Sequence, residues 1–363
     1  MVRVTVEPMT SMERVLTTLR HKEPDTVPVF LFLGAHGAKE LGLPARDYYR
    51  NADNVAEAQL KLLERYGHDC LDPTSWVAIE YEAMGGEPIF HDDAPPMSAA
   101  PILRSAEDVR RFKPPRVADT ACLQEAVRGI ALLKREVEDR VPIVGLVASP
   151  FSLPVMQLGY PAYLELMSRH ETSLGYLLEA NTEFCVEWAN AQFAAGATVV
   201  AYVDPVSSAT CSSSAEFGQF GLPTAKRAIS RFQGPAVYHL ASGLCSPILD
   251  SLAATGAVAV AIGHDDDLGR LKRAAAGRVG LLGNLNSIAA CRWSSAEAEA
   301  AVKDAIAQGG PGGGFILSDG CGCIPCQVSA DTLRAIVDAA HRWGRYPLDW
   351  VQPHATETSD PHL

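Results

Sequence analysis

The sequence predicts a (β/α)8 TIM barrel with an N-terminal helical extension. In the C-terminal two thirds of the chain, short continuous apolar runs alternate about five times with amphipathic stretches. Unbroken apolar runs are typical of parallel strands buried on both faces, and the stretches between them are typical of crossover helices. The N-terminal third is long enough to supply the remaining units. A doubly wound open sheet is the alternative, because periodicity alone does not separate the two folds.

The whole chain, residues 1–363, is expected to form a single domain. It has 363 residues, of which 47% are hydrophobic, and a barrel of this size is common as one domain. A first helix is predicted to begin near Ser11, which can cap it, so residues 1–27 are assigned to the helical extension. A second helix is predicted over 54–66, ending at Gly67.

The later elements follow in strict alternation. An extended apolar run, VPVFLFL, precedes the second helix. The strands are predicted over 142–149, 197–204, 234–239, 257–263, 279–286 and 314–320. The helices are predicted over 161–193 (as one or two helices), 247–255, 268–276, 294–308 and 329–343.

Charge and composition exclude several classes of partner. The net charge is −12 and no block of five or six basic residues occurs, which argues against nucleic acid and anionic membranes as partners. The N-terminus lacks the apolar stretch of a signal peptide, and no apolar run reaches about 18 residues, so we expect a cytoplasmic protein. In a reducing compartment the nine cysteines are not expected to form disulfides.

Polar residues stand where the predicted strands end. In a barrel, the side chains at the C-terminal ends of the strands converge on one mouth. The residues at these ends are Ser149, Asp204, His239, His264, Asn284, Asn286, Cys321 and Cys323. The barrel fold therefore predicts one imidazole and several thiols around a single opening.

The stretch DGCGCIPC, residues 319–326, places three cysteines within six residues. Imidazole and thiolate are the ligands that zinc prefers, so we predict a metal site made of His239, Cys321 and Cys323, with a fourth position open to substrate. Zinc would hold a substrate thiol as its thiolate. The alternatives are inert, buried cysteines in a glycine-rich turn, or a redox role.

The other polar residues at the strand ends have two interpretations each. Asp204 either orients a substrate or caps the following turn, and Asn284 either binds ligand or bonds to backbone. We take Asp204 and Asn284 as candidate catalytic residues that orient the substrate. His264 in GHDDDLG is typical of a solvated loop residue, with a metal ligand as the alternative.

Short stretches spread over nearly the whole chain resemble one known family. They are SMERVLTTLRHKEPDTVPV, YGHDCLDP, EYEAMGGE, ASPFSLPVMQLGY, YVDPVSS, VYHLASG, SPILDSLAATG, VGLLGNLN and GFILSDGCGCIP. In this order they resemble the uroporphyrinogen decarboxylase superfamily, and within it the cobamide-dependent methyltransferases, such as methylcorrinoid:coenzyme M methyltransferases. The resemblance implies a (β/α)8 barrel.

Two departures qualify the resemblance. The decarboxylases grip substrate carboxylates with an arginine-rich segment after the first strand, and here that region reads FLFLGAHGAKEL, without arginine. The thiol-methylating branch holds zinc with His-x-Cys and a distant Cys; His239 and Cys321 match, but the middle position is Ala241. Cys323 is our first choice for the missing ligand, with Cys326 and Cys245 as alternatives.

The resemblance implies a methyltransferase. It would move a methyl group between a corrinoid carried by a separate protein and a small-molecule methyl acceptor, a thiol activated by Zn2+. The alternatives are transfer to tetrahydrofolate without zinc, a decarboxylase-like lyase reaction, and a non-catalytic barrel that carries or senses a corrinoid or a metal.

Overall fold

Six consecutive parallel strands form the central sheet of the computed structural model, which describes residues 8–352 apart from positions 75, 92 and 276. Their order in the sheet is their order in the chain. The strands are β3 Val144–Ala148, β4 Val199–Val203, β5 Ala236–His239, β6 Ala259–Ala261, β7 Gly280–Leu285 and β8 Phe315–Asp319. All six predicted strands are therefore confirmed, and they pair in parallel as a barrel requires.

Two extended segments close the sheet between β8 and β3. Val29 forms a parallel bridge with Leu317 of β8, and Leu71 forms one with Ile143 just before β3. The two segments are joined to each other by the Asp69 amide, which donates to the Val29 carbonyl at 2.7 Å. The segments around Val29 and Leu71 thus occupy the two remaining strand positions, and the fold is a closed (β/α)8 barrel.

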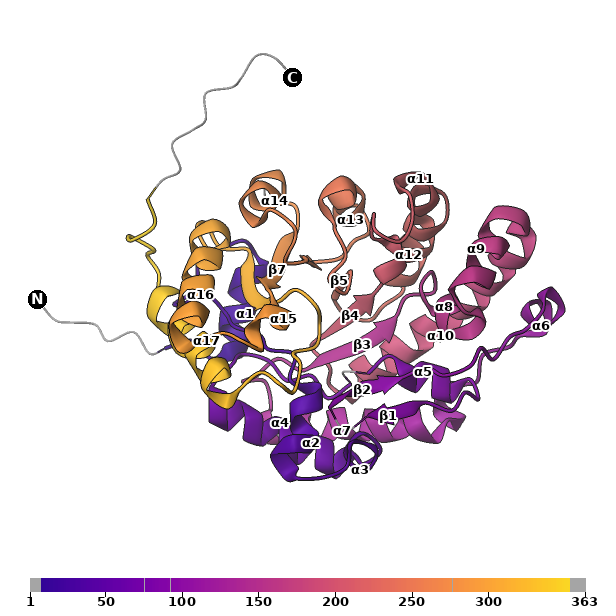
Figure 1. Cartoon of the computed structure of the whole chain (residues 1–363), viewed down its shortest axis with the longest axis horizontal. Helices are drawn as coiled ribbons and strands as arrows, with labels where there is room; N and C mark the ends of the chain where they lie inside the picture. Colours follow the sequence, from indigo (N-terminus) through magenta and orange to yellow (C-terminus); the bar gives the residue numbers. More distant parts are fainter. Residues whose placement is uncertain (1–7, 75, 92, 276, 353–363) are drawn as a thin grey trace, which may run out of the picture.

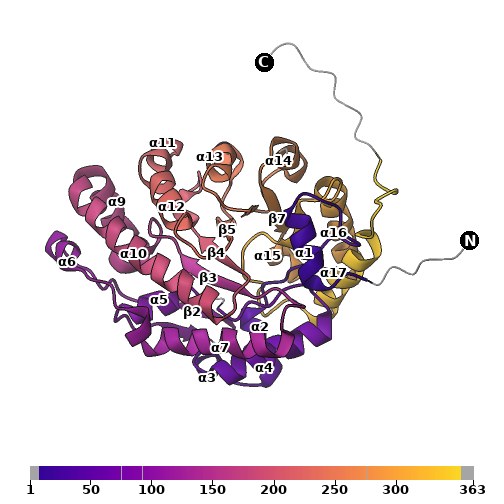
Figure 2. The same cartoon turned by 180° about the vertical axis from the view of Figure 1, so that it is seen from behind.

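Helices surround the strands on all sides in the two opposite views (Figures 1 and 2). A short antiparallel hairpin of β1 (Ile89–His91) and β2 (Ala94–Met97) is added to the barrel. The helices are α1 Ser11–Leu19, α2 Gly34–Leu41, α3 Ala45–Tyr49, α4 Ala52–Tyr66, α5 Ala78–Ala83, α6 Ala106–Arg111, α7 Ala121–Val137, α8 Leu153–Leu158, α9 Tyr160–Arg169, α10 Glu171–Ala195, α11 Ser214–Glu216, α12 Leu222–Ile229, α13 Leu249–Ala253, α14 Leu268–Ala275, α15 Ser287–Ala290, α16 Ser295–Gly309 and α17 Ala330–Trp343. Short helical turns are η1 Val117–Asp119, η2 Pro205–Ser207, η3 Phe217–Gly221 and η4 Ser246–Ile248.

The N-terminal extension seals one end of the barrel. Val15 of α1 belongs to the same buried apolar cluster as the inward side chains of the strands, including Val144, Val199, Val237 and Ile316. These four residues lie in the first half of their strands, so α1 covers the N-terminal end of the barrel. The opposite, C-terminal end is left as the mouth, where barrel enzymes carry their active sites.

Local sequence features account for most helix ends, with one difference from the predicted caps. The first helix is capped by Thr10, whose side chain forms a reciprocal capping box with Glu13, and not by Ser11, which donates to the Asp69 carboxylate instead. The stretch predicted over 161–193 is two helices, α9 and α10. The helix α16 is capped by Ser294, whose side chain forms a capping box with Glu297. None of the helices in the described part of the chain has the length and hydropathy of a membrane span.

A buried ion pair should control the stability of the closure. Asp69 is about 1% exposed; it accepts from Arg14 at 2.6 Å and from the Val29 amide at 2.9 Å. Asp69→Ala removes one carboxylate partner from the largely buried guanidinium of Arg14. We therefore expect the free energy of unfolding, measured by urea denaturation, to fall by about 3–5 kcal/mol. Asp250→Ala is the control, because Asp250 pairs with Arg278 on the surface and should change stability by less than about 0.5 kcal/mol. Equal losses in the two variants would contradict this role for Asp69.

Candidate functional site at the barrel mouth

A small pocket of about 170 Å³ opens at the C-terminal end of the barrel. Its walls are the last inward side chains of β3 and β4, together with Phe32, Trp76 and the prolines of β2. His239 of β5 and the residues Cys321–Cys323 after β8 also line it. The imidazole and both thiols of the predicted site, which are about eighty residues apart in sequence, therefore meet at one pocket.

His239 presents a buried hydrogen-bond donor to this pocket. The side chain is 2% exposed, and burial lowers its pKa to about 4, so the ring is neutral at pH 7. Nδ1 accepts a hydrogen bond from the Ala241 amide at 3.0 Å, which places the single ring proton on Nε2. Nε2 is buried and has no hydrogen-bond partner among the described residues. A buried donor without a partner is costly, so this atom marks a ligand position.

The turn after β8 packs its backbone directly on the imidazole. Asp319 is buried, and its Oδ2 accepts from the amides of Cys321 at 3.2 Å and Gly322 at 2.8 Å, which fixes the turn. Gly322 has a φ of 81°, and a Cβ at this position would lie 2.7 Å from Cε1 of His239. Only glycine allows this approach. Burial raises the pKa of Asp319 to about 6.

The thiol of Cys323 is not prepared as a thiolate. Burial raises the pKa of Cys323 well above its usual value, with the nearby Asp319 carboxylate adding to the effect. The two alternative ligands lie elsewhere: Cys245 is fully buried, and neither it nor Cys326 lines the pocket.

Zinc was predicted to bind His239, Cys321 and Cys323, and the donor types suit it. Within the described residues, however, no three His, Cys, Asp or Glu side chains are arranged to hold a metal ion. In addition, a histidine that binds metal through Nε2 carries its proton on Nδ1, whereas here Nδ1 accepts from Ala241. This arrangement does not fit a zinc ion, and zinc stays a prediction of the sequence.

Asp204 lies at the end of β4 but does not line the pocket. Its carboxylate is fully buried and accepts hydrogen bonds from the hydroxyls of Ser152 and Ser207, each at 2.5 Å, and of Tyr238. Its amide donates to the His239 carbonyl at 2.8 Å. Asp204 therefore supports the end of β5 from behind the pocket wall.

Asn284 faces a different hollow. Its amide donates to the carbonyl oxygen of Asp266 at 3.2 Å and lies near that of Gly263, and it lines a separate cavity of about 450 Å³ with Asn286 and His264. The remaining strand-end residue, Ser149, accepts from the Ser152 amide at 2.8 Å. The structure thus brings together His239, Cys321 and Cys323, and places Asp204 and Asn284 outside their pocket.

Several residues of the site were not singled out from the sequence. Phe32 is the last residue but one of the VPVFLFL run. Its ring meets that of His239 edge-on, with centroids 5.5 Å apart. Trp76 follows the YGHDCLDP stretch, and Pro95 and Pro96 come from the hairpin. The strand-end rule applied to the first apolar run would have pointed to its last two residues, Phe32 and Leu33. The hairpin prolines carry no such signal.

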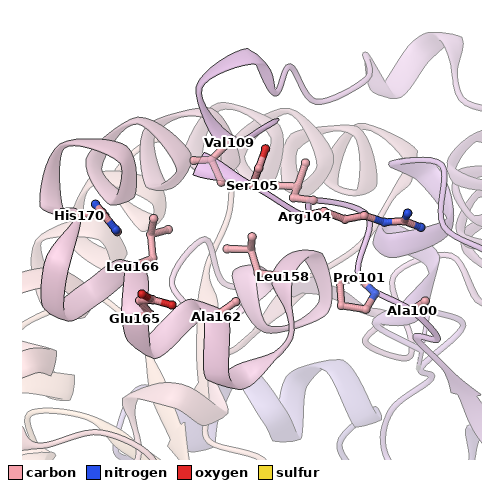
Figure 3. Close-up of a pocket in the computed structure, with 11 residues that line it drawn as sticks. Ala100, Pro101, Arg104, Ser105, Val109, Leu158, Ala162, Glu165, Leu166 and His170 are labelled. Carbon is pink, nitrogen blue, oxygen red and sulfur yellow. The ribbon is translucent and has the colours of Figure 1, made fainter. Parts of the chain in front are cut away.

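A larger cavity of about 470 Å³ lies away from the mouth, beside α9 (Figure 3). His170 and Glu165 stand at one end and Arg104 at the other, with the apolar side chains of Leu158 and Leu166 between them. None of its lining residues lines the mouth pocket. Because its polar groups do not converge on one point, we do not take this cavity as the functional site.

A closed barrel with a buried, unpartnered imidazole at its C-terminal mouth is the architecture of a barrel enzyme. The chain belongs to the uroporphyrinogen decarboxylase (URO-D) family, whose model matches residues 10–343. Curated relatives are the uroporphyrinogen decarboxylases of Thioalkalivibrio sulfidiphilus, 26% identical over 92% of this chain and 98% of that protein, and of Bordetella petrii, 27% identical over 82% and 84%.

Solved structures support the same fold. A methyltransferase from Methanosarcina mazei superposes with a TM-score of 0.83 at 24% identity, over 92% of this chain and 99% of that one. A putative vitamin-B12-independent methionine synthase from Listeria monocytogenes superposes with a TM-score of 0.54 at 17% identity, over 89% and 98%. At these identities the likeness is one of fold. The resemblance to the URO-D superfamily is confirmed.

Replacing Gly322 tests the contact between the turn and His239. Gly322→Ala combines a positive φ with a clash against the ring, whereas Gly312→Ala has a similar φ of 77° and no atom within 4 Å of the new Cβ. We expect Gly312→Ala to cost about 1–2 kcal/mol and Gly322→Ala about 1–3 kcal/mol more, measured by urea denaturation. If the two variants unfold alike, the turn does not rest on His239.

Proposed function

We propose that this chain is a methyltransferase that moves a methyl group between a corrinoid held by a separate protein and a small thiol. The observation that carries the proposal is the unpartnered Nε2–H of His239, which shares one small pocket with the Cys321–Cys323 turn. A corrin macrocycle is several times larger than a pocket of about 170 Å³, so only the methyl group and the acceptor enter it. The corrinoid supplies an electrophilic methyl group at the mouth.

His239 would stabilise the sulfur of the acceptor. The ring is neutral and already carries its proton on Nε2, so it acts as a donor and not as a base. The thiol proton leaves to solvent, and the Nε2–H bond to the resulting thiolate keeps the sulfur anionic and directed at the methyl carbon. Transfer forms the new carbon–sulfur bond as the bond to the methyl donor breaks.

Asp204 would act as a positioning residue in this proposal. Its amide holds the His239 carbonyl, and its carboxylate is satisfied by three hydroxyls, so it fixes β5 without touching substrate. Asn284 would likewise act as a positioning residue, because its side-chain amide donates to the carbonyl of Asp266 and holds the neighbouring loop.

A decarboxylase reaction on a porphyrinogen is the second candidate, favoured by the names of the curated relatives. A substrate with several carboxylates needs cations to bind them. Among the described residues that line the mouth pocket there is no Arg or Lys. This lining supports methyl transfer over porphyrinogen decarboxylation.

The decisive assay uses purified protein with methylcobalamin and 2-mercaptoethanol, following the loss of methylcobalamin absorbance. We expect turnover above the protein-free rate. His239→Ala should reduce the rate about 100-fold, and His239→Gln, which keeps an N–H donor, should retain part of it. His264→Ala, in the other cavity, is the matched control and should be unaffected. If the protein is inactive with the thiol but active with tetrahydrofolate, tetrahydrofolate is the methyl acceptor. If it is inactive with both, the alternative of a non-catalytic barrel that carries or senses a corrinoid or a metal is favoured.

Metal analysis of the purified chain tests the zinc prediction separately. The arrangement of His239, Cys321 and Cys323 leads us to expect well under one zinc per chain. About one zinc per chain that is lost in Cys321→Ser, but kept in the control Cys211→Ser at an exposed cysteine, would show that the turn closes on a metal ion.

A further inference from the structure

The walls of the mouth pocket are apolar and uncharged. Phe32, Trp76, Leu146 and Val203 line it, with prolines from the hairpin at the rim. The described lining residues include no Arg, Lys, Asp or Glu, and their polar side-chain groups are the rings of His239 and Trp76 and the thiols of Cys321 and Cys323. A second anionic group, placed against these walls away from Nε2 of His239, would lose its hydration without gaining a cation or a hydrogen-bond donor, which costs several kcal/mol.

Two arginines on the hairpin side, Arg46 and Arg50, are separated from the pocket by aromatic rings. Arg46 and Arg50 lie over the ring of Phe90, at 4.6 and 5.1 Å from its centroid. Phe90 packs on Trp76 with centroids 5.8 Å apart, and it is Trp76 that lines the pocket. Arg50 is also paired with Glu82 at 2.7 Å. These guanidinium groups are therefore held on the outer side of an aromatic layer.

Size and polarity restrict the ligand further. A volume of about 170 Å³ is below the range of about 300–1,000 Å³ that is typical of sites for drug-sized ligands. Among the described residues that line the pocket, His239 is the one with a buried side-chain N–H that has no partner, and this donor can satisfy one acceptor atom. The pocket thus suits a molecule with one polar atom and a short apolar tail.

We propose that the mouth pocket selects a small neutral thiol with an apolar tail and rejects thiols that carry a carboxylate or sulfonate. This inference rests on the proposed function for the identity of the sulfur as the reacting atom. The sulfur faces Nε2 of His239, and the tail lies against Phe32, Trp76 and Leu146.

Two isosteric thiols test the selectivity. 3-Methylbutane-1-thiol and 3-mercaptopropanoate have the same number of heavy atoms. The first ends in an isopropyl group and the second in a carboxylate of the same shape. Binding is measured without a methyl donor, by calorimetry and by the shift of the His239 Nε2–H resonance. We expect the neutral thiol to bind at least about 50-fold more tightly, since each tenfold step is about 1.4 kcal/mol. Equal affinities, or tighter binding of the carboxylate, would overturn the inference.

A variant of the pocket rim provides the matched control. Val77 is half-buried and lines the pocket, so Val77→Lys places a cation there while Val77→Met has similar length without charge. Val77→Lys should reverse the preference toward 3-mercaptopropanoate, and Val77→Met should keep it. An unchanged preference in Val77→Lys would contradict selection by the uncharged wall.

The two proposals fail separately. If the neutral thiol binds selectively but the protein does not demethylate methylcobalamin with it, methyl transfer is wrong and the selectivity stands. If methyl transfer proceeds equally well to 3-mercaptopropanoate, the selectivity is wrong and methyl transfer stands.

Discussion

Closure of the sheet by two irregular segments is the constraint on which the rest of the molecule depends. Six strands pair regularly, but the ring is completed by single bridges at Val29 and Leu71, and by the Asp69 amide between them. Without these bonds the ends of β5 and β8 would belong to an open sheet. Because they are present, His239 and the Cys321–Cys323 turn lie around one mouth, and the ion pair of Asp69 with Arg14 attaches the sealing helix at the other end.

Three polar residues at strand ends show how partners decide what a buried group can do. Asp204 is fully buried, and its carboxylate accepts from three hydroxyl donors behind the pocket wall. Asp319 uses one oxygen to fix the turn, while its other oxygen has no partner among the described residues. Nδ1 of His239 accepts a hydrogen bond from a backbone amide, and its Nε2–H faces the pocket without a partner among the described residues. All three residues are buried, but Asp204 supports β5, Asp319 fixes the turn after β8, and His239 offers a hydrogen-bond donor to a ligand.

The sequence predicts the regular parts of this fold well, because long apolar runs and caps such as Ser294 are local signals. It predicts the closing segments poorly, since single bridges leave no periodic pattern. Strand alternation could have shown that Val203, and not Asp204, faces the pocket, because side chains two apart share a face. By the same rule Asn284 should share the inward face of Leu282, but hydrogen bonds to the carbonyls of a neighbouring loop hold it elsewhere, and no sequence signal reports those bonds.

The backbone after β5 explains why the site differs from the metal-binding pattern that the sequence resembles. Ala241 and Ser242 both have positive φ, at 48° and 70°, which is unfavourable for residues with a Cβ. The Ser242 amide bonds to the Gly320 carbonyl at 2.9 Å, which holds this bend against the turn after β8. The bend also aims the Ala241 amide at Nδ1 of His239. Position 241 thus contributes a main-chain donor to the site, and that donor makes the imidazole a hydrogen-bond donor toward the pocket.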